Sequence, residues 1–420
     1  MFQIPRGTRD FTSADMIKRR YVETKIKSIF ERYGYKEIQT PTFETLELFT
    51  AKSGESIIDE LYSFKDKGGR NLALRPELTA PVIRMYVDKL QMEAKPLKLF
   101  YFGNCFRYDR PQKGRYREFK QAGCEIIGSD TSEANAELIA MAFKILENVG
   151  LKNINLNIGN LKILKSIFKK LKLTKEQQNY ITPLIDKSMY EELFAALIDY
   201  KIKAEDANSL IKLLDTSDLK EIKNFIKDDE LAKKELEELK IILSYLKNIY
   251  KIKNPNIKMA IVRGLDYYTG VVFEIEAPIL GAEKQLCGGG VYELIKLFGG
   301  KEFPQAGFAI GFDRTILALE SEKFQFPIKE INFFVIPVNE DMIQKSLEIT
   351  EIIRKNNYTV DLDLLKRGLT KSLKYASSIN AKKVIIVGPK ELETNSITIR
   401  DMKTGEQEIV KIKEITKQLK

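Results

Sequence analysis

Residues 106–119 read FRYDRPQKGRYREF, a strongly basic stretch that joins two strand-like runs. The flanking runs are LKLFYFGNCFRYD at 97–109 and FKQAGCEIIG at 119–128, whereas the link contains proline and glycine. This pattern predicts two strands joined as a hairpin. Basic side chains recur through it and aromatic ones are interleaved with them: Arg107, Arg110, Lys113, Arg115 and Arg117, with Phe106, Tyr108, Tyr116 and Phe119.

The basic residues of this hairpin indicate a site for an anion. A charge run is usually a solvated surface. Arg107 and Arg117, however, lie in the strand-like flanks, where a side chain points to a defined face. There a guanidinium can bind phosphate oxygens in bidentate fashion, and an aromatic neighbour can stack on a base. From the hairpin alone, a nucleotide site and a solvated surface are about equally supported.

Two later segments favour the nucleotide site. VRGLDYYTG at 262–270 places Arg263 beside turn glycines, and GFAIGFDR at 307–314 ends in Arg314 at a strand-to-helix junction. Three separate segments thus present an arginine from a strand end, which suggests polyphosphate bound on an antiparallel sheet. Arginine suits the charge that grows on a transferring phosphorus, because it stays protonated and needs no reorganisation.

The 420-residue chain contains no histidine, which excludes several kinds of catalytic site. A Ser-His-Asp or Cys-His pair and any His-ligated metal site are impossible. The three cysteines, Cys105, Cys124 and Cys287, are isolated, which predicts buried structural thiols in a reducing compartment. The formal net charge of +10 favours an anionic partner, such as nucleic acid, a nucleotide or a membrane surface.

Hydrophobic periodicity divides the rest of the chain into regions. A helix is predicted at about 13–33, followed by extended chain around Pro41. The stretch at about 161–253 is rich in Lys, Glu, Leu and Ile, which predicts a small helical domain; 259–277 then has strand character. Beyond Pro327, strands alternate with helices, as in a mixed or parallel α/β sheet. No apolar run approaches the roughly 18 residues of a membrane span and no secretion signal is visible, so we expect a cytoplasmic protein without membrane contact.

Together these segments resemble the motifs of class II aminoacyl-tRNA synthetases, and among them the histidyl-tRNA synthetases. The helix with YKEIQTPTFE resembles the first class motif, FRYDRPQKGRYREF the second and GFAIGFDR the third. RGLDYYTG, LRPELT and QAGCE resemble segments peculiar to the histidine enzymes. The likeness covers nearly the whole chain.

The resemblance implies an α+β fold with a particular domain order. A class II catalytic domain built on an antiparallel sheet would span 1–160 and 256–326. A helical insertion domain at 161–255 would interrupt it, and a C-terminal α/β anticodon-binding domain would occupy 327–420. The implied activity is ATP-dependent activation of L-histidine to histidyl-adenylate and pyrophosphate, then transfer to the 3′ end of tRNA(His). ATP would be a substrate accompanied by Mg²⁺, without an assigned metal ligand, and the expected assembly is a symmetric homodimer.

The same resemblance implies roles at the ATP end of the site. Arg107 and Arg263 would be catalytic, contacting the α-phosphate from two sides, and Arg314 would contact the γ-phosphate. Asp109 matches an acid that reads the adenine amino group, and Phe119 matches an aromatic residue that stacks on the ring. The ATP site so implied comprises Arg107, Asp109, Arg115, Phe119 and Arg314.

For the amino acid, the implied site comprises Glu77, Thr79, Gln121, Glu125, Arg263, Tyr267 and Tyr268. Glu125 and Tyr268 match the positions that read the imidazole, whose two nitrogens a carboxylate and a phenol can satisfy one each. Glu77 taken alone would more often be a helix cap than a binding residue. Gln112 and Arg115 match positions that the acceptor end of tRNA approaches. Activation needs no general base, because the carboxylate of the amino acid is already ionised, so a histidine-free catalyst is chemically reasonable.

One departure and three alternatives accompany this interpretation. In CGGGVYELI, Val291 stands where the family commonly has arginine and Glu293 where it has aspartate. The synthetase-like regulatory subunit of ATP phosphoribosyltransferase is one alternative, although such subunits usually lose the motif arginines and the C-terminal domain. A class II synthetase for glycine, proline or threonine is another, and a pure nucleic-acid-binding module is the third.

Overall fold

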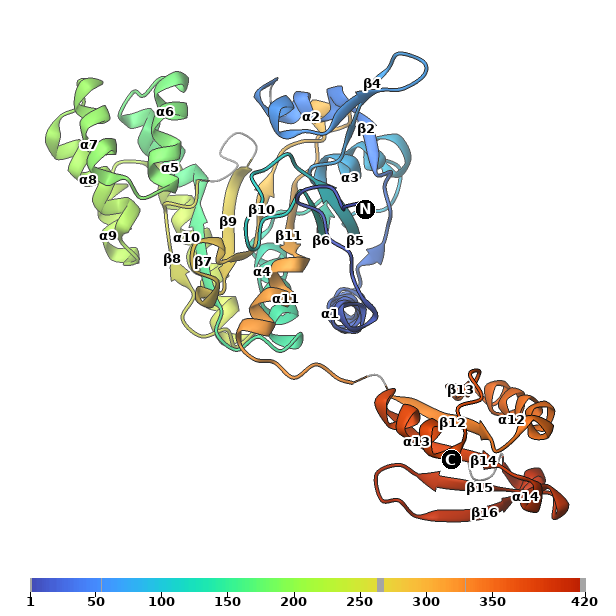
Figure 1. Ribbon diagram of the computed structural model, residues 1–420. Helices are drawn as coiled ribbons and strands as arrows, with labels where there is room; N and C mark the ends of the chain where they lie inside the picture. The colour runs from blue at the N-terminus through green and yellow to red at the C-terminus, as the bar shows by residue number, and fades with distance from the viewer. Residues whose placement is uncertain (1, 54, 263–267, 329, 416–420) are drawn as a thin grey trace. The chain divides into compact units, whose positions relative to one another are not determined.

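The computed structural model describes residues 2–53, 55–262, 268–328 and 330–415. The chain forms two compact units, Met1–Phe326 and Pro327–Lys420 (Figure 1). Within the described ranges, no helix is long and apolar enough to cross a membrane.

The first unit is built on an eight-stranded sheet in the order β1-β5-β6-β11-β10-β9-β7-β8. The six central strands pair antiparallel, and only the short edge strands β1 and β8 pair parallel with their neighbours. This arrangement confirms the predicted α+β class. In sheet order the strands are β1 (Lys36–Glu37), β5 (Leu97–Phe106), β6 (Glu118–Ile127), β11 (Gln305–Gly311), β10 (Gln285–Tyr292), β9 (Tyr268–Glu276), β7 (Asn155–Asn160) and β8 (Asn256–Ile257).

One face of this sheet carries the main hydrophobic core. Helices α1 (Ser13–Arg32), α4 (Ser132–Asn148) and α11 (Phe312–Ser321) bury apolar side chains against it. A capping box between Thr12 and Asp15 starts α1, which satisfies backbone donors that would otherwise lack a partner. Phe30 of α1 stacks on Phe100 of β5 and Phe308 of β11, with ring centroids 5.0 and 5.9 Å away. This packing fixes the rear of the sheet on which the site is built.

The opposite face lies under a smaller layer. It contains a three-stranded sheet in the order β2-β4-β3 and two short helices. Its elements are β2 (Phe43–Thr45), α2 (Leu46–Ser53), the 3₁₀ turn Glu55–Glu60, β3 (Ser63–Lys65), β4 (Asn71–Leu74), α3 (Thr79–Met85) and the π-helical turn Tyr86–Leu90. Buried Leu78 and Val82 pack on Tyr101 of β5, so this layer closes over one end of the sheet.

A set of helices follows β7, as the Lys-, Glu- and Leu-rich composition predicted. They are α5 (Leu161–Lys170), α6 (Lys175–Asp186), α7 (Tyr190–Asp199), α8 (Ala204–Asp215), α9 (Leu219–Phe225) and α10 (Glu230–Asn248). Asn160 caps α5 and also donates to buried Glu235 at 3.0 Å, which ties the start of this region to α10. α10 packs on α4 and so joins the main core.

The return to the sheet differs from its prediction in one detail. Strand character was expected from Met259, but Met259–Val262 form a turn and irregular chain, and β9 begins at Tyr268. The apolar run is buried against the helical insert at Ala260, Ile261 and Val262. Its hydrophobicity therefore serves core packing and not strand pairing.

The second unit is a five-stranded sheet in the order β13-β12-β14-β15-β16. Pairing is parallel among β13, β12 and β14 and antiparallel between β14, β15 and β16, so the sheet is mixed. The elements are β12 (Ile331–Pro337), α12 (Ile343–Lys355), β13 (Val360–Leu362), α13 (Leu369–Ser378), β14 (Ala381–Val387), α14 (Pro389–Glu393), β15 (Ser396–Asp401) and β16 (Gln407–Lys411).

Candidate active site

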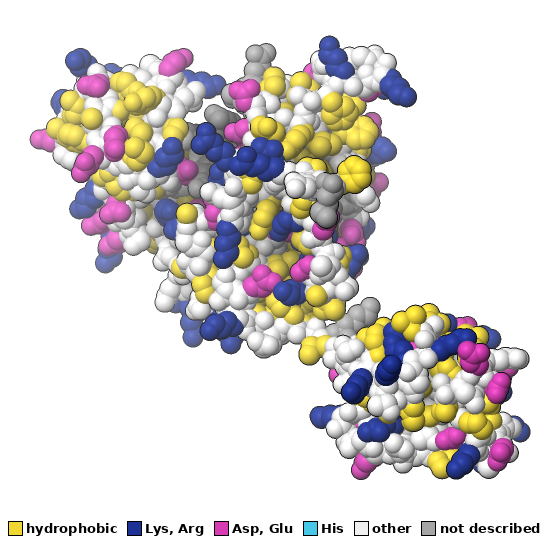
Figure 2. Space-filling model, viewed as in Figure 1, with side chains coloured by type: hydrophobic (Ala, Val, Ile, Leu, Met, Phe, Trp, Pro, Cys, Tyr) yellow, Lys and Arg dark blue, Asp and Glu magenta, His cyan; other side chains and the backbone are white. Residues whose placement is uncertain are grey.

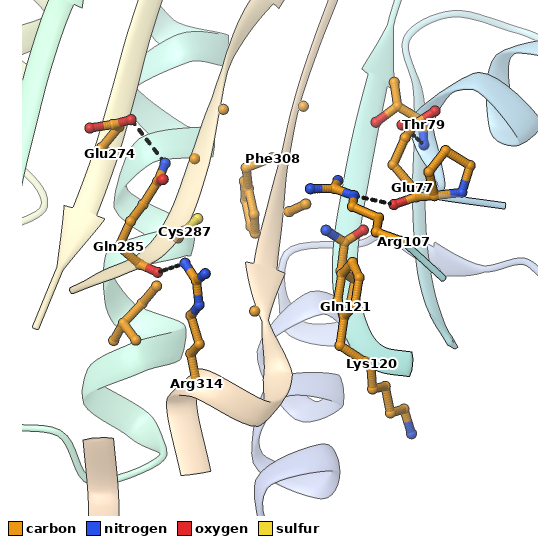
Figure 3. Close-up of a pocket in the computed structure, with 18 of the residues that line it drawn as sticks. Glu77, Thr79, Arg107, Lys120, Gln121, Glu274, Gln285, Cys287, Phe308 and Arg314 are labelled. Atoms are coloured by element: carbon orange, nitrogen blue, oxygen red, sulfur yellow. Dashed lines mark hydrogen bonds between the residues drawn. The ribbon is translucent and has the colours of Figure 1, made fainter. Parts of the chain in front are cut away.

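A cavity of about 500 Å³ lies in the first unit, over the middle strands of the large sheet. Figure 3 shows side chains from several distant segments converging on it. On the face drawn in Figure 2, Lys and Arg side chains gather near the upper ends of β9 and β10. Ten of the residues predicted for the site line the cavity: Glu77, Thr79, Arg107, Asp109, Arg115, Phe119, Gln121, Glu125, Tyr268 and Arg314.

Three predicted residues stand apart from this set. Arg263 and Tyr267 lie outside the described residues. Gln112 is not among the residues that line the cavity; its side-chain amide donates to Glu283 at 2.7 Å.

Arg107 is fixed at the end of β5. Its Nε donates to the carbonyl of Pro76 at 3.0 Å, and its guanidinium carbon lies 5.3 Å from the centre of the Phe119 ring. The backbone N–H of Arg107 donates to the carbonyl of Arg117, which continues the β5–β6 pairing past the last strand residues. A held guanidinium next to an aromatic ring is what binding of a phosphate beside a base requires.

Arg314, on the first turn of α11, lies on the other side of Phe308 (Figure 3). Its Nε donates to the carbonyl of Gly114 at 2.9 Å and its Nη1 to the carbonyl of Gln285 at 3.1 Å, while Nη2 pairs with Glu283. Two neutral carbonyls therefore orient the guanidinium in the cavity wall, and the Glu283 carboxylate pairs with its third nitrogen.

Glu125 of β6 forms the buried end of the cavity. The side-chain hydroxyls of Tyr101 and Tyr292 donate to its two carboxylate oxygens at 2.9 and 2.5 Å. Burial raises the pKa of Glu125 from 4.5 to about 7, although the hydrogen bonds from Tyr292, Tyr101 and Thr79 oppose this rise. Facing it on β11 is Gly307, where a Cβ atom would lie 1.8 Å from Glu125 Oε2. The glycine leaves space for the carboxylate.

Glu77 combines the two roles that the sequence left open, because it lines the cavity and also caps a helix. Its carboxylate accepts hydrogen bonds from the backbone N–H groups of Thr79 and Ala80 at 2.8 and 3.0 Å, at the start of α3. Lys52 of α2 forms an ion pair with it at 3.2 Å. The cavity therefore contains a carboxylate whose position is set by backbone donors and a buried cation.

The cysteines are buried, as predicted, but two of them are close to the site. The thiol of Cys105 donates to Gln121 Oε1 at 3.3 Å, and burial raises the pKa of Cys105 to about 12. Cys287 lines the cavity, and burial raises the pKa of its thiol as well. Both therefore remain protonated thiols at neutral pH.

Sequence reasoning missed several residues of the cavity. Lys52 lies in a helix without a recognisable motif. Glu274 of β9 accepts a hydrogen bond from Gln285 at 2.9 Å, and only the folded sheet brings this pair into the cavity wall. The hydrogen bond from Tyr292 to Glu125 joins two strands that are far apart in sequence. Among the described residues, no group of three or more Cys, Asp and Glu side chains is placed to hold a metal ion.

The large sheet and the cavity together hold a recognisable set of charged and aromatic groups. A six-stranded antiparallel core carries two arginines at strand and helix ends, an aromatic residue beside one of them, and a buried carboxylate at the far end of the same cavity. The sequence resemblance to the class II aminoacyl-tRNA synthetases predicts such an arrangement.

Comparison with known proteins identifies the family. The histidyl-tRNA synthetase family model matches residues 7–315, and an anticodon binding domain matches residues 332–420. A histidine–tRNA ligase of Methanocaldococcus jannaschii is 46% identical over 99% of both chains, and one of Methanosarcina acetivorans is 44% identical over 99% of this chain and 98% of the relative. The structure of apo S. aureus histidyl-tRNA synthetase, 30% identical, superposes over 100% of both chains with a TM-score of 0.79. The chain belongs to the histidyl-tRNA synthetase family.

Proposed function

We propose that the cavity activates L-histidine with ATP and that the protein then transfers the histidyl group to the 3′ end of tRNA(His). In the first step a carboxylate oxygen of histidine attacks the α-phosphorus, forming histidyl-adenylate and releasing pyrophosphate. In the second step a ribose hydroxyl of the tRNA attacks the acyl carbon, the bond between that carbon and the phosphate oxygen breaks, and the hydroxyl proton passes to the phosphate of the departing AMP. Neither step needs a histidine side chain in the enzyme.

At the ATP end, Arg107 would contact the α-phosphate, and Arg314 the γ-phosphate. Both guanidinium groups are held by backbone carbonyls, so little reorganisation is needed as negative charge shifts toward the leaving pyrophosphate. Phe119 would stack on the adenine and Asp109 would accept from its amino group. Arg263 would contact the α-phosphate from the other side; this role follows from its motif alone, because it lies outside the described residues.

At the amino-acid end, Glu125 and Tyr268 would read the two imidazole nitrogens. Glu77, Thr79 and Gln121 would bind the α-amino and carboxylate groups. Glu125 is 1% exposed and accepts hydrogen bonds from two tyrosine hydroxyls. An imidazole N–H would add a further donor to this buried carboxylate, whereas an apolar side chain would add none. This buried tyrosine–carboxylate cluster is the observation that carries the assignment to histidine.

Further parts of the proposal rest on the family. Mg²⁺ would accompany ATP and would reduce the negative charge that the phosphates present to the cavity. A symmetric homodimer formed through the first motif is the proposed assembly. Arg115 and Gln112, on the β5–β6 loop, would face the acceptor end of tRNA, and the second unit would bind the anticodon. The proposed location is the cytoplasm.

Amino-acid-dependent exchange between ATP and labelled pyrophosphate tests this proposal. We would assay all twenty amino acids singly, without tRNA, and expect exchange with histidine alone. Exchange with another amino acid would refute the assignment of the imidazole site while leaving the class II chemistry intact. Silence with every amino acid, from a folded protein, would favour the regulatory-subunit alternative.

A further inference from the structure

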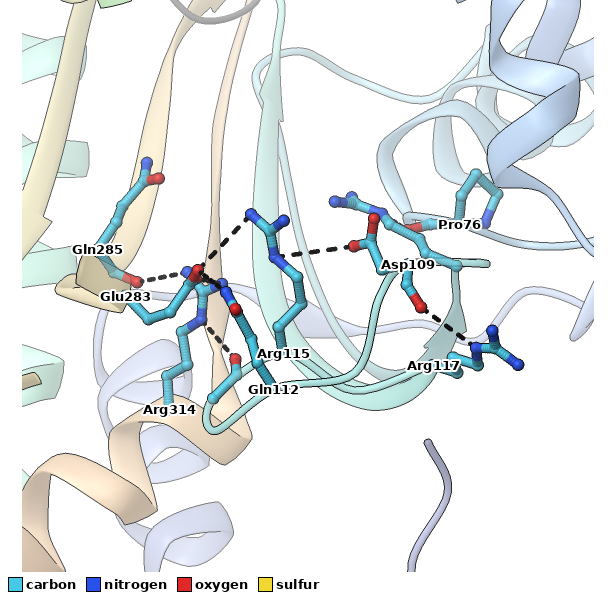
Figure 4. A network of polar contacts seen from close by, with 10 residues as sticks. Pro76, Asp109, Gln112, Arg115, Arg117, Glu283, Gln285 and Arg314 are labelled. Atoms are coloured by element: carbon cyan, nitrogen blue, oxygen red, sulfur yellow. Dashed lines mark hydrogen bonds and ion pairs between the residues drawn. The ribbon is translucent and has the colours of Figure 1, made fainter. Parts of the chain in front are cut away.

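Glu283 gathers the polar side chains of the ATP end, although the proposed mechanism assigns it no role. It ends the 3₁₀ segment Pro278–Glu283, in the turn between β9 and β10. Its carboxylate accepts a hydrogen bond from Gln112 Nε2 at 2.7 Å, lies 3.7 Å from Arg115 Nη2, and pairs with Arg314 Nη2 (Figure 4). One carboxylate thus contacts three side chains, two of them cationic.

Two glycines allow this contact. Gly281 has φ +61°, which an L side chain rarely adopts, and it shapes the turn that presents Glu283. Gly114, in the β5–β6 loop, has φ +82°, and a Cβ atom there would lie 3.5 Å from the Cβ of Glu283. The loop and the turn therefore approach each other closely, and the side chain of Glu283 is only 16% exposed.

Arg314 is anchored in two ways that differ in kind. Its Nε and Nη1 donate to the backbone carbonyls of Gly114 and Gln285, and these bonds do not involve Glu283. Nη2, by contrast, is neutralised by the Glu283 carboxylate. A phosphate group that approached Arg314 and Arg115 would meet this carboxylate as a like charge and would compete with it for the same guanidinium groups.

We propose that Glu283 is a latch that takes the place of phosphate in the ATP-free protein. Its carboxylate holds Arg115, Gln112 and Arg314, and so closes the loop 109–116 against the β9–β10 turn. When ATP binds, its phosphates replace Glu283 on the two arginines, while the carbonyls of Gly114 and Gln285 keep Arg314 oriented. The loop then loses its contact with the turn. This inference rests on the proposed ATP site.

The test is the charge-removing variant Glu283→Gln in the full-length protein. Its matched control is Glu276→Gln, because Glu276 pairs with Lys284 at 3.2 Å across the base of the same turn but contacts neither arginine. Two quantities are measured without histidine, so that no reaction occurs: the dissociation constant of ATP by titration calorimetry, and the rate of limited tryptic cleavage after Lys113 and Arg115. Arg110 is followed by proline, which protects that bond from trypsin.

We expect Glu283→Gln to bind ATP about three- to tenfold more tightly, because a competing, largely buried charge is removed. Without ATP, Glu283→Gln should also be cleaved in the loop several times faster than Glu276→Gln. For Glu276→Gln, the dissociation constant of ATP and the cleavage rate should both match those of the unchanged protein. Unchanged or weaker ATP binding would overturn the latch, since weaker binding would mean that Glu283 holds Arg314 in its productive position.

Two further measurements keep the test decisive. If Glu283→Gln does not fold, Glu283→Asp can be used, because it retains the charge but withdraws it from the arginines by one methylene. The ATP affinity of Glu283→Asp should still exceed that of the unchanged protein. An equal or lower affinity overturns the proposal. Failure of the proposed function would give a different result. The unchanged protein would bind ATP and Glu283→Gln would show both expected effects, but no amino acid would support pyrophosphate exchange. If the unchanged protein binds no ATP, the latch is also wrong.

Discussion

Replacing Glu125 with glutamine should remove a defined part of the pH dependence of stability. The pKa of Glu125 rises from 4.5 to about 7 in the folded protein, chiefly because the carboxylate is buried. The folded state therefore binds the proton more tightly than the unfolded state. The resulting stabilisation is complete below about pH 4.5 and is lost as pH rises through 7. The rise in pKa corresponds to about 3 kcal/mol between these limits.

The assay is urea unfolding followed by circular dichroism at several pH values between 5 and 8. The free energy of unfolding of the unchanged protein should decrease relative to Glu125→Gln as pH rises, by up to about 3 kcal/mol across the range. Glu302→Gln, which removes an exposed carboxylate, should follow the unchanged protein. If the curves for the unchanged protein and Glu125→Gln run parallel, the buried carboxylate does not titrate as described and the reasoning fails.

Three further predictions follow from neighbouring contacts. Tyr292→Phe leaves one oxygen of Glu125 without its tyrosine donor. In pyrophosphate exchange, kcat/KM for histidine should therefore fall about tenfold or more. An unchanged kcat/KM would exclude a role for this hydrogen bond. Gly307→Ala would place a methyl group 1.8 Å from Glu125 Oε2, and the midpoint of thermal unfolding should drop by several degrees, corresponding to about 1–3 kcal/mol; a neutral result would contradict the close approach. Finally, a thiol reagent at pH 8 should leave the native protein unlabelled and should label three thiols in urea. The reason is that Cys105, Cys124 and Cys287 are buried and burial raises their pKa values. Rapid labelling of the native protein would refute that burial.

Much of the fold follows from local patterns. The hairpin that contains 106–119 needs only two apolar runs and a polar link, and helix α1 has both periodicity and a capping box at Thr12. The error at Met259–Val262 has a physical origin, since a short apolar run can be buried by helices as well as by a sheet.

The site was less accessible to sequence reasoning than the fold. Arg107 and Arg314 were recognisable because their motifs resemble those of a known family, and both line one cavity. The partners that hold them were not recognisable. The pair between Gln112 and Glu283 spans 171 residues, and neither side chain carries a signal that names the other. Contacts of this kind depend on strand register and turn geometry, which are set by the whole domain.

This chain charges tRNA(His) with histidine, as its full-length relatives indicate. The most direct measurement is aminoacylation, in which the protein, ATP, Mg²⁺, labelled histidine and a tRNA(His) transcript are combined and the labelled tRNA is collected. We predict labelled tRNA that requires ATP and is abolished by Arg107→Ala or Glu125→Ala in folded protein. If no labelled tRNA forms, the chain is not a histidine–tRNA ligase; if label accumulates equally with both variants, this cavity is not its active site.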